Sequence, residues 1–293
     1  MTSLVLLLEM MALILGPVFL LAGIVLTWRY WDKRRRKTRS PLSEDLLRAP
    51  GESLWHQFRK TDDKLNEAFM FVFLLPALFI GFWGYQSASG LSTQPWLYVL
   101  VTLIIVFWAA RRLMKLTKER DKLRLGYDAE RAVAQNLNEL LRDGYSVFHD
   151  LPTDTGNIDH VVVGPNGVFA VETKGRSKTP RGQGKEAVKV AVTTTELRFP
   201  HGVETQPIEQ AKRQAKWLSK WLTSATGMSV EAAPALALPG WFVEHKERPS
   251  MLVFNGKNPR TLFAKVGNQR LGEQEITQIC HQLRQHCSSV ERL

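Results

Sequence analysis

Asp159, Glu172 and Lys174 interrupt an otherwise apolar hairpin pattern, TGNIDHVVVGPNGVFAVETKG, at residues 155–175. Two carboxylates and an ammonium on one face suit a hard divalent cation, because Mg²⁺ binds through one or two carboxylates together with water and phosphate oxygens. Beside such an ion, Lys174 could position or deprotonate an attacking water, or neutralise charge building on phosphorus. The pattern therefore suggests phosphoryl chemistry, with Asp159 and Glu172 as ligands of Mg²⁺ or Mn²⁺.

The turn between the two strands decides whether these side chains share a face. GPNG at residues 164–167 is the strongest turn sequence nearby. If its middle two residues are central, Asp159 faces Glu172; if its last two are central, Asp159 faces Lys174. Side chains alternate along a strand and cross-strand partners share a face, so both registers put the three charges together and turn His160 away.

A structural explanation of the three charges stays open beside the chemical one. Cross-strand ion pairs are common on half-exposed sheets and contribute roughly 0.2–1 kcal/mol. Under that interpretation, the charges would only stabilise the hairpin.

A helix is expected just before the hairpin, in GYDAERAVAQNLNELLRDG at residues 126–144. Glu130, Ala134, Leu137 and Leu141 follow the spacing of one helix face. An acidic residue is also favoured in the first turn of a helix by its dipole. Because Glu130 lies on the apolar stripe, we expect it to point into the sheet beside the hairpin carboxylates.

A second helix is expected at QPIEQAKRQAKWLSKWL, residues 206–222. Its buried stripe should consist of Ile208, Ala211, Ala215, Leu218 and Leu222. Gln210 borders this stripe, together with Gln214, Trp217 and Trp221. The two tryptophans could stack on nucleobases, although packing against the core or near a membrane is the commoner use.

The remaining elements complete an α/β pattern. Strands are expected at YSVFHDL (145–151), AVKVAVTT (187–194), PALALPGWFV (234–243) and MLVFN (251–255), and a closing helix at GEQEITQICHQLRQHC (272–287). This order predicts a mixed sheet flanked by helices. Cys280 and Cys287 are expected as free thiols, since the closing helix lacks the paired ligand spacing of a zinc finger.

The first part of the chain is typical of a membrane protein. Apolar runs at Leu4–Trp28, Ala68–Tyr85 and Trp96–Ala110 predict three transmembrane helices. Seven Lys and Arg residues follow the first run and seven follow the third, whereas the connection between the second and third carries none, so we expect the N-terminus outside and residues after Arg111 in the cytoplasm. The predicted location is the inner (plasma) membrane of a bacterium.

These patterns divide the chain into five parts: a first transmembrane helix (1–30), a basic cytoplasmic loop (31–66), two further transmembrane helices (67–112), a basic linker (113–125) and an α/β domain (126–293).

The net charge of +11 is weak evidence for nucleic-acid binding. Residues 1–125 carry 18 basic and 10 acidic side chains, so most of the excess lies beside the apolar runs. Within the α/β domain, Arg176, Lys178, Arg181 and Lys185 crowd one stretch and could follow a phosphate backbone. A solvated charged face is the alternative.

Three segments in order, GYDAE, GNIDHVVVGPNGVFAVETKG and QPIEQAKRQAKWL, resemble the nuclease-related domain (NERD) family of the PD-(D/E)xK restriction-endonuclease-like superfamily. The resemblance covers roughly residues 120–293. It implies a restriction-endonuclease-like fold, phosphodiester hydrolysis, and catalytic roles for Glu130, Asp159, Glu172, Lys174 and Gln210. Ile158 stands where the superfamily name has proline.

The leading hypothesis is a membrane-anchored, Mg²⁺-dependent nuclease that acts on DNA or RNA in the cytoplasm. A non-catalytic module that holds nucleic acid or a protein at the membrane is the main alternative, and a membrane scaffold is a third. Retention of two acids beside a lysine favours the nuclease, because binding a phosphate alone requires no carboxylate.

Overall fold

The computed structural model describes residues 20–21, 23–28, 30–31, 46–90, 94–178, 185–247 and 250–289. The chain divides into two compact units, Met1–Glu44 with Lys64–Lys115, and Asp45–Asp63 with Leu116–Leu293. The division falls within two long helices, α2 (Glu52–Ala88) and α3 (Pro95–Leu137), so each helix contributes residues to both units.

In the first unit, α2 and α3 carry the second and third apolar runs. By length and composition, α2 and the helical stretch Trp96–Asp143 are able to cross a membrane. Only 12% and 0% of their most apolar windows are buried within the described chain, unlike the core helices of a soluble protein. At about 1.5 Å per residue, each helix exceeds a hydrocarbon core of about 30 Å, so only part of it would span. Most of the first apolar run lies outside the described residues.

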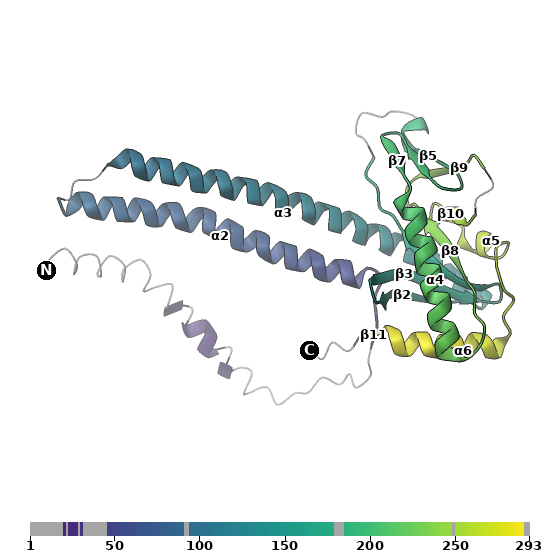
Figure 1. The fold of residues 1–293 in the computed structure, drawn as a ribbon. Helices are drawn as coiled ribbons and strands as arrows, with labels where there is room; N and C mark the ends of the chain where they lie inside the picture. The colour runs from purple at the N-terminus through teal and green to yellow at the C-terminus, as the bar shows by residue number, and fades with distance from the viewer. Residues whose placement is uncertain are drawn as a thin grey trace. The chain divides into compact units, whose positions relative to one another are not determined.

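The second unit is built on a five-stranded sheet of order β10-β8-β4-β3-β2 (Figure 1). Its strands are β2 (Ser146–Thr153), β3 (Gly156–Gly164), β4 (Gly167–Thr173), β8 (Ala232–Ala237) and β10 (Leu252–Phe254). Strands β2, β3 and β4 pair antiparallel, whereas β4, β8 and β10 pair parallel. The expected mixed sheet is confirmed, and the finer restriction-endonuclease-like assignment stays a prediction.

The β3–β4 hairpin adopts the first of the two expected turns. Gly164 pairs with Gly167, which makes the middle two residues of GPNG central. Gly167 has a φ of +114°, which favours glycine, and a Cβ atom on Gly164 would lie 2.1 Å from the Tyr145 ring. This register sets Asp159 opposite Glu172, one step beyond the last paired residues.

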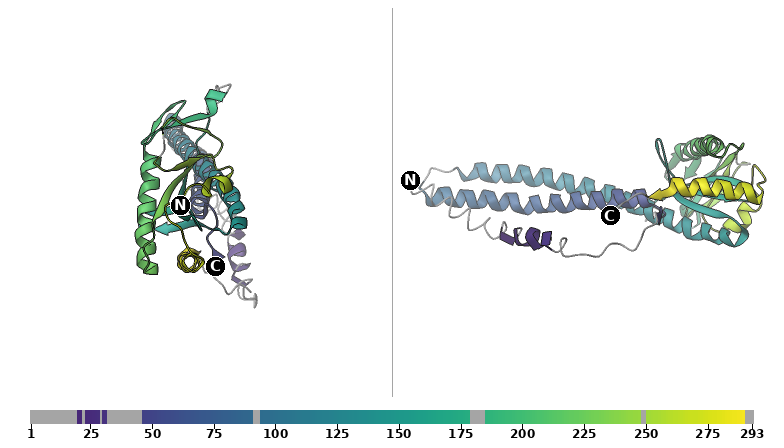
Figure 2. Two further views of the ribbon diagram at one scale, coloured as in Figure 1. Left: turned by 90° about the vertical axis from the view of Figure 1, so that its right-hand side faces the viewer. Right: turned by 90° about the horizontal axis from the view of Figure 1, so that it is seen from below.

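Helices cover both faces of the sheet (Figure 2). On one face, α4 (Gln206–Thr226) and α6 (Glu273–Cys287) pack against Val161, Val163 and Ala170. On the other, the end of α3, the 3₁₀-helix η1 (Asn138–Asp143) and the short α5 (Pro259–Phe263) surround Val162 and Phe169. This sandwich holds the ends of β3 and β4, which carry the charged residues, in fixed positions.

The sequence predicted the buried residues of one helix correctly and those of the other only in part. All five expected residues of α4 are buried, as predicted. In the preceding helix, Leu137 is buried, but Leu141 is 55% exposed and Leu140 is fully buried in its place. The prediction of Leu141 was wrong because the chain tightens into η1, whose three residues per turn shift the phase of the stripe.

A second, four-stranded sheet has the order β7-β6-β5-β9. It comprises β5 (Lys189–Val192), preceded by the 3₁₀-helix η2 (Lys185–Val188), then β6 (Leu197–Phe199), β7 (Gly202–Glu204) and β9 (Phe242–His245). The single strand expected at 234–243 is in fact two, β8 and β9, which join different sheets. Gly240, with a φ of +82°, turns the chain between them.

Residues 45–63 fall within the basic loop expected at 31–66, but they belong to the unit that holds both sheets. The two-residue strand β1 (Leu46–Leu47) pairs with β11 (Ser288–Ser289). Next to it, the guanidinium of Arg48 forms an ion pair with Asp150 of β2, which is fully buried. The Asp150 carboxylate also accepts hydrogen bonds from Ser53 Oγ at 2.8 Å and Asn157 Nδ2 at 2.5 Å. A buried carboxylate thus joins the start of α2 to the β2–β3 hairpin.

We expect Arg48→Met to destabilise this unit by about 3 kcal/mol or more, because removing one partner leaves the buried Asp150 charge without its counterion. Chemical unfolding of the full-length chain in detergent, followed by far-ultraviolet circular dichroism, would measure the loss. Arg59→Met, at an exposed position of α2, is the matched control. Equal stability of the two variants would contradict this role of Arg48.

Candidate active site

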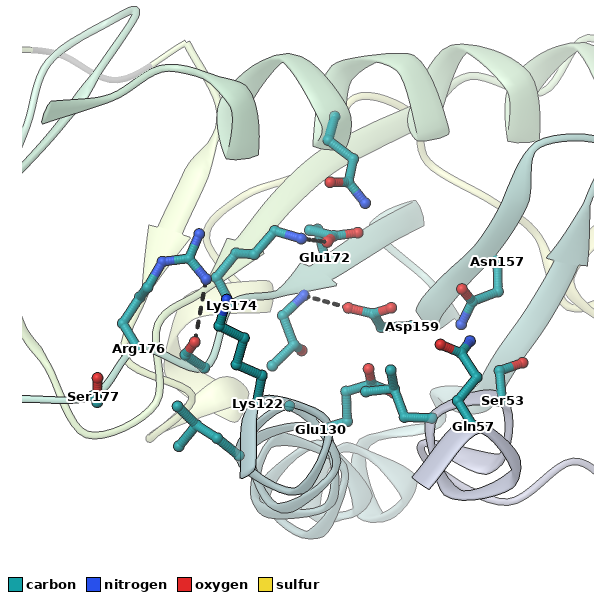
Figure 3. A pocket seen from close by; sticks show the side chains of 16 residues that line it. Ser53, Gln57, Lys122, Glu130, Asn157, Asp159, Glu172, Lys174, Arg176 and Ser177 are labelled. Carbon is teal, nitrogen blue, oxygen red and sulfur yellow. Dashed lines mark hydrogen bonds and ion pairs between the residues drawn. The ribbon is translucent and has the colours of Figure 1, made fainter. Parts of the chain in front are cut away.

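A cavity of about 540 Å³ lies where the ends of β3 and β4 approach α3 (Figure 3). Its walls come from α2, α3, β3, β4, the segment after β4, and α4. Every lining residue belongs to the unit of Asp45–Asp63 and Leu116–Leu293. The predicted residues Glu130, Asp159, Glu172, Lys174 and Gln210 all line this one cavity.

Asp159 and Glu172 are held at the cavity by specific hydrogen bonds. The backbone N–H of Thr173 donates to Asp159 Oδ2 at 2.7 Å, across the end of the hairpin. Glu172 Oε1 lies 2.5 Å from Lys174 Nζ, and its Oε2 accepts a hydrogen bond from Gln214 Nε2, also at 2.5 Å. Both residues are buried: Asp159 is 6% exposed and Glu172 is 1% exposed. The cross-strand geometry expected from the sequence is therefore present, together with a direct Lys174–Glu172 ion pair.

Glu130 reaches the cavity from α3, on the other side of the sheet from α4, and from well beyond the apolar part of that helix. It is 4% exposed, and its Oε2 has no hydrogen-bond partner among the residues that the structure describes. Burial, followed by the negative charges of Asp150 and Glu172, raises the pKa of Glu130 to about 8, against a smaller opposing effect of Lys174. Glu130 can therefore exchange a proton near neutral pH.

The same effects act on Asp159. Burial, then the charges of Glu172 and Glu130, hold the pKa of its carboxyl well above the usual range, although the Thr173 hydrogen bond and the Lys174 charge oppose the shift. Neighbouring carboxylates thus oppose the ionisation of both Glu130 and Asp159, and Lys174, which pairs directly with Glu172, acts in the opposite direction. Additional positive charge at this cavity would stabilise their ionised forms.

The donor set fits a hard divalent cation. Asp159 and Glu172 supply oxygen ligands, and the unpartnered Oε2 of Glu130 lies in the same cluster. Across the described ranges, no group of three or more His, Cys, Asp and Glu side chains is arranged to hold a metal ion by itself. Mg²⁺ commonly completes its octahedron with water and phosphate oxygens. We therefore expect weak binding without substrate and tighter binding with it.

Of the four residues expected to bind nucleic acid, Arg176 lines this cavity. Arg176 lines the cavity, but its Nε and Nη2 bind Glu204 at 2.8 and 2.6 Å, which raises the pKa of Arg176. Lys178 is exposed. Arg181 lies outside the described residues, and the side chain of Lys185 is likewise not described.

The prediction of a glutamine from α4 at the site holds only in part. Gln210 lines the cavity, but the glutamine hydrogen-bonded to Glu172 is Gln214, one turn further along α4. Gln214 Nε2 donates to Asn157 O at 3.0 Å as well. The position of Gln214 on the border of the buried stripe was the only sequence signal of this role.

Residues that were not predicted from the sequence form a further wall of the cavity. Figure 3 shows Ser53 and Gln57 of α2 and Lys122 of α3 extending from the helices below the carboxylates. No local pattern of the sequence indicated them, because Ser53 reaches the site through its hydrogen bond to Asp150. Lys122 adds a second lysine to the lining.

Histidines and cysteines of this unit lie away from the cavity. His160 faces away from Asp159, as expected, and its Nδ1 lies 2.9 Å from Nδ1 of His149, its partner in β2. Burial lowers the pKa of His149 to about 4 and that of His160 well below its usual value. Cys280 and Cys287 are free and buried in the core beside α6.

Residues 125–239 match the family model of NERD, the nuclease-related domain. The match includes the five predicted catalytic residues and excludes Ser53, Gln57 and Lys122. No curated protein and no solved structure matches the chain. The resemblance to the nuclease-related domain is thus confirmed for this stretch.

Glu130→Gln should stabilise the protein at pH 8 in the presence of EDTA. Between its ordinary pKa of 4.5 and about 8, folded Glu130 keeps a proton that the unfolded chain releases, so stability falls as the pH rises through this range. Removing the titration should raise the free energy of unfolding by about 2–4 kcal/mol at pH 8 and by less than about 1 kcal/mol at pH 5. Paired unfolding curves of the full-length chain would measure both values.

Glu139→Gln is the control, since Glu139 is exposed on the neighbouring helix. It should change stability little at either pH. A Glu130→Gln variant less stable than wild type at pH 8 would show that the carboxyl is not under electrostatic strain.

Proposed function

We propose that the protein is a membrane-anchored, divalent-metal-dependent nuclease that hydrolyses phosphodiester bonds in DNA or RNA. The convergence of Asp159, Glu172 and Lys174 with Glu130 on one cavity carries this proposal. These residues lie within the nuclease-related part of the chain. Their chemistry, hard oxygen ligands beside an ammonium, suits a phosphate substrate.

Each side chain has a distinct part in this proposal. Asp159 and Glu172 would hold Mg²⁺ or Mn²⁺, which supplies Lewis-acid stabilisation of phosphate charge and lowers the pKa of the attacking water. Lys174 fixes Glu172 and places its ammonium where charge develops on the phosphate. Glu130, with a pKa near 8, is suited to take up or release a proton near neutral pH. Gln214 restrains Glu172 from the α4 side, and Gln210 is available to contact substrate.

The long apolar helices support anchoring in a lipid bilayer. We propose three spans, with the N-terminus outside and the nuclease-related domain in the cytoplasm, in the inner membrane of a bacterium. The distribution of Lys and Arg around the apolar runs supports this orientation. Anchoring would restrict cleavage to nucleic acid that reaches the membrane.

One observation favours the alternative of a non-catalytic binding module. The ion pair between Lys174 and Glu172 satisfies both charges without substrate. A module of this kind would bind nucleic acid, or a protein, through the same cavity and leave it uncut.

We expect Lys174→Ala to reduce kcat for cleavage by about 100-fold or more and to leave substrate affinity nearly unchanged, because its charge acts mainly in the transition state. The Lys174 charge also lowers the pKa of Glu130 and Asp159, so its loss should move the pH–rate profile to higher pH. Single-turnover cleavage of labelled single-stranded and duplex DNA and RNA would measure these changes.

Lys178→Ala is the matched control for catalysis. Lys178 is exposed and does not line the cavity, so its loss should weaken binding and its salt dependence but retain turnover at saturating substrate. Wild-type rates in Lys174→Ala and in Glu172→Gln would reject the nuclease and leave the binding module.

Asp159→Asn should weaken binding of Mn²⁺ by about tenfold or more, because it removes one ligand charge and keeps the shape of the side chain. Titration calorimetry on the full-length chain, with and without a phosphorothioate oligonucleotide, would follow it. Asp128→Asn, exposed on α3, is the control. Unchanged Mn²⁺ affinity in Asp159→Asn would place the metal elsewhere.

Reporter fusions at Gly90 and Leu293 should report opposite sides of the membrane, Gly90 outside and Leu293 in the cytoplasm. Alkaline phosphatase and a fluorescent protein give complementary signals for the two sides. The three-span topology is wrong if both positions report one side.

A further inference from the structure

A second polar groove adjoins the catalytic cavity, and its hairpin side and Trp217 have no part in the chemistry described above. It has a volume of about 330 Å³ and lies between the tip of the β2–β3 hairpin and one face of α4. We call it the hairpin–α4 groove; its lining consists of Thr153, Thr155, Gly156, Asn157, Gln210, Arg213, Gln214 and Trp217. Its volume falls at the small end of ligand pockets, about 300–1,000 Å³.

The groove is continuous with the catalytic cavity. Asn157 and Gln210 line both spaces. Gln214, a further residue of the groove, binds Glu172 through Nε2 and the carbonyl oxygen of Asn157 through the same atom. A polymer whose phosphate lies at Glu172 therefore has a direct path into the groove.

Trp217 supplies an aromatic surface of fixed orientation. Its Nε1 donates to Asp154 Oδ2 at 3.1 Å, and its ring stacks on Trp221 with an interplanar angle of 4°. Trp221 in turn packs on His286, with ring centroids 4.6 Å apart. Trp217 lines the groove, whereas Trp221 does not. The indole is thus held in place from behind and available to a ligand in front.

The charge of the groove suits a phosphate-bearing strand. Arg213 is the charged residue of its described lining, and it lies 3.9 Å from Glu209, with both side chains mostly exposed. Thr153, Thr155 and Asn157 offer hydroxyl and amide groups that can donate or accept hydrogen bonds. An aromatic platform, one exposed cation and neutral polar groups are the elements that bind single strands without strong sequence preference.

We propose that the hairpin–α4 groove binds an unpaired nucleotide next to the scissile phosphate, with its base on Trp217 and its phosphate near Arg213. The inference rests on the proposed nuclease function and adds a substrate class to it: single-stranded nucleic acid, or duplex ends and junctions that supply an unpaired base. A paired base is stacked within its helix and cannot present its face to an indole.

Binding is tested without cleavage, on the full-length chain in detergent with EDTA. The probe is a fluorescein-labelled oligothymidylate of about a dozen nucleotides, a length within the usual site sizes of single-strand binders. Trp217→Leu should weaken binding by about fivefold or more, and Trp217→Phe should retain most of the affinity. Phe242→Leu is the matched control, since it removes an exposed aromatic ring outside the groove.

Two further comparisons separate stacking from folding and from charge. Replacing the thymines by abasic residues should abolish the difference between wild type and Trp217→Leu. Arg213→Gln, at an exposed position, should lower affinity and reduce the salt dependence by about one ion, whereas Lys216→Gln, one turn away and outside the groove, should not.

Equal affinities for wild type, Trp217→Leu and Arg213→Gln would overturn the proposal, as would equal losses in Trp217→Leu and Phe242→Leu or a loss that persists with the abasic probe. Failure of the nuclease is distinguished by a separate result. If wild type cleaves nothing with Mg²⁺ or Mn²⁺ but the Trp217 effect is present, the groove is a single-strand site of a binding module.

Discussion

Three carboxylates buried at one cavity are the constraint on which the rest of this domain depends. Glu130, Asp159 and Glu172 are each at most 6% exposed, and Lys174 forms an ion pair with Glu172. Burial and mutual repulsion raise the pKa of both Glu130 and Asp159. Charges forced together in this way are tolerated only where the surrounding backbone leaves the side chains no alternative position. The elements around the cavity are best understood as the means of that restraint.

Each acid is fixed from a different direction. The β3–β4 turn sets the register, and the Thr173 N–H then holds Asp159. Gln214 of α4 holds Glu172, while α3 brings Glu130 from the opposite face of the sheet. Buried Asp150 adds to the negative potential at Glu130, and its pairing with Arg48 also ties the start of α2 to the hairpin. The start of α2 therefore forms part of the wall of the site, and Arg48 before it pairs with a carboxylate that acts on Glu130.

The sequence was most informative where local rules decide the structure. Strand alternation and the GPNG turn were enough to place Asp159, Glu172 and Lys174 on one face, and helical spacing turned Glu130 inward. Leu141 was misplaced because a 3₁₀ turn changes the period, which the spacing of apolar residues does not reveal. Strands β6 and β7, three residues each, are too short for an alternation pattern. Ser53 and Gln57 could not be predicted, since a contact such as Ser53–Asp150 spans 97 positions and depends on the tertiary fold.

The balance of charges also bears on the structural explanation of the hairpin. An ion pair that only stabilised the end of the hairpin would need Glu172 and Lys174, and it would gain nothing from two more buried acids nearby. Among the described residues, Oε2 of Glu130 has no hydrogen-bond partner. Burial and neighbouring negative charges oppose the ionisation of this carboxyl. Strongly shifted acids that gather at a cavity favour function over structural support. The ion pair is then best understood as the device that keeps Lys174 and Glu172 oriented until a cation and a phosphate supply the missing charges.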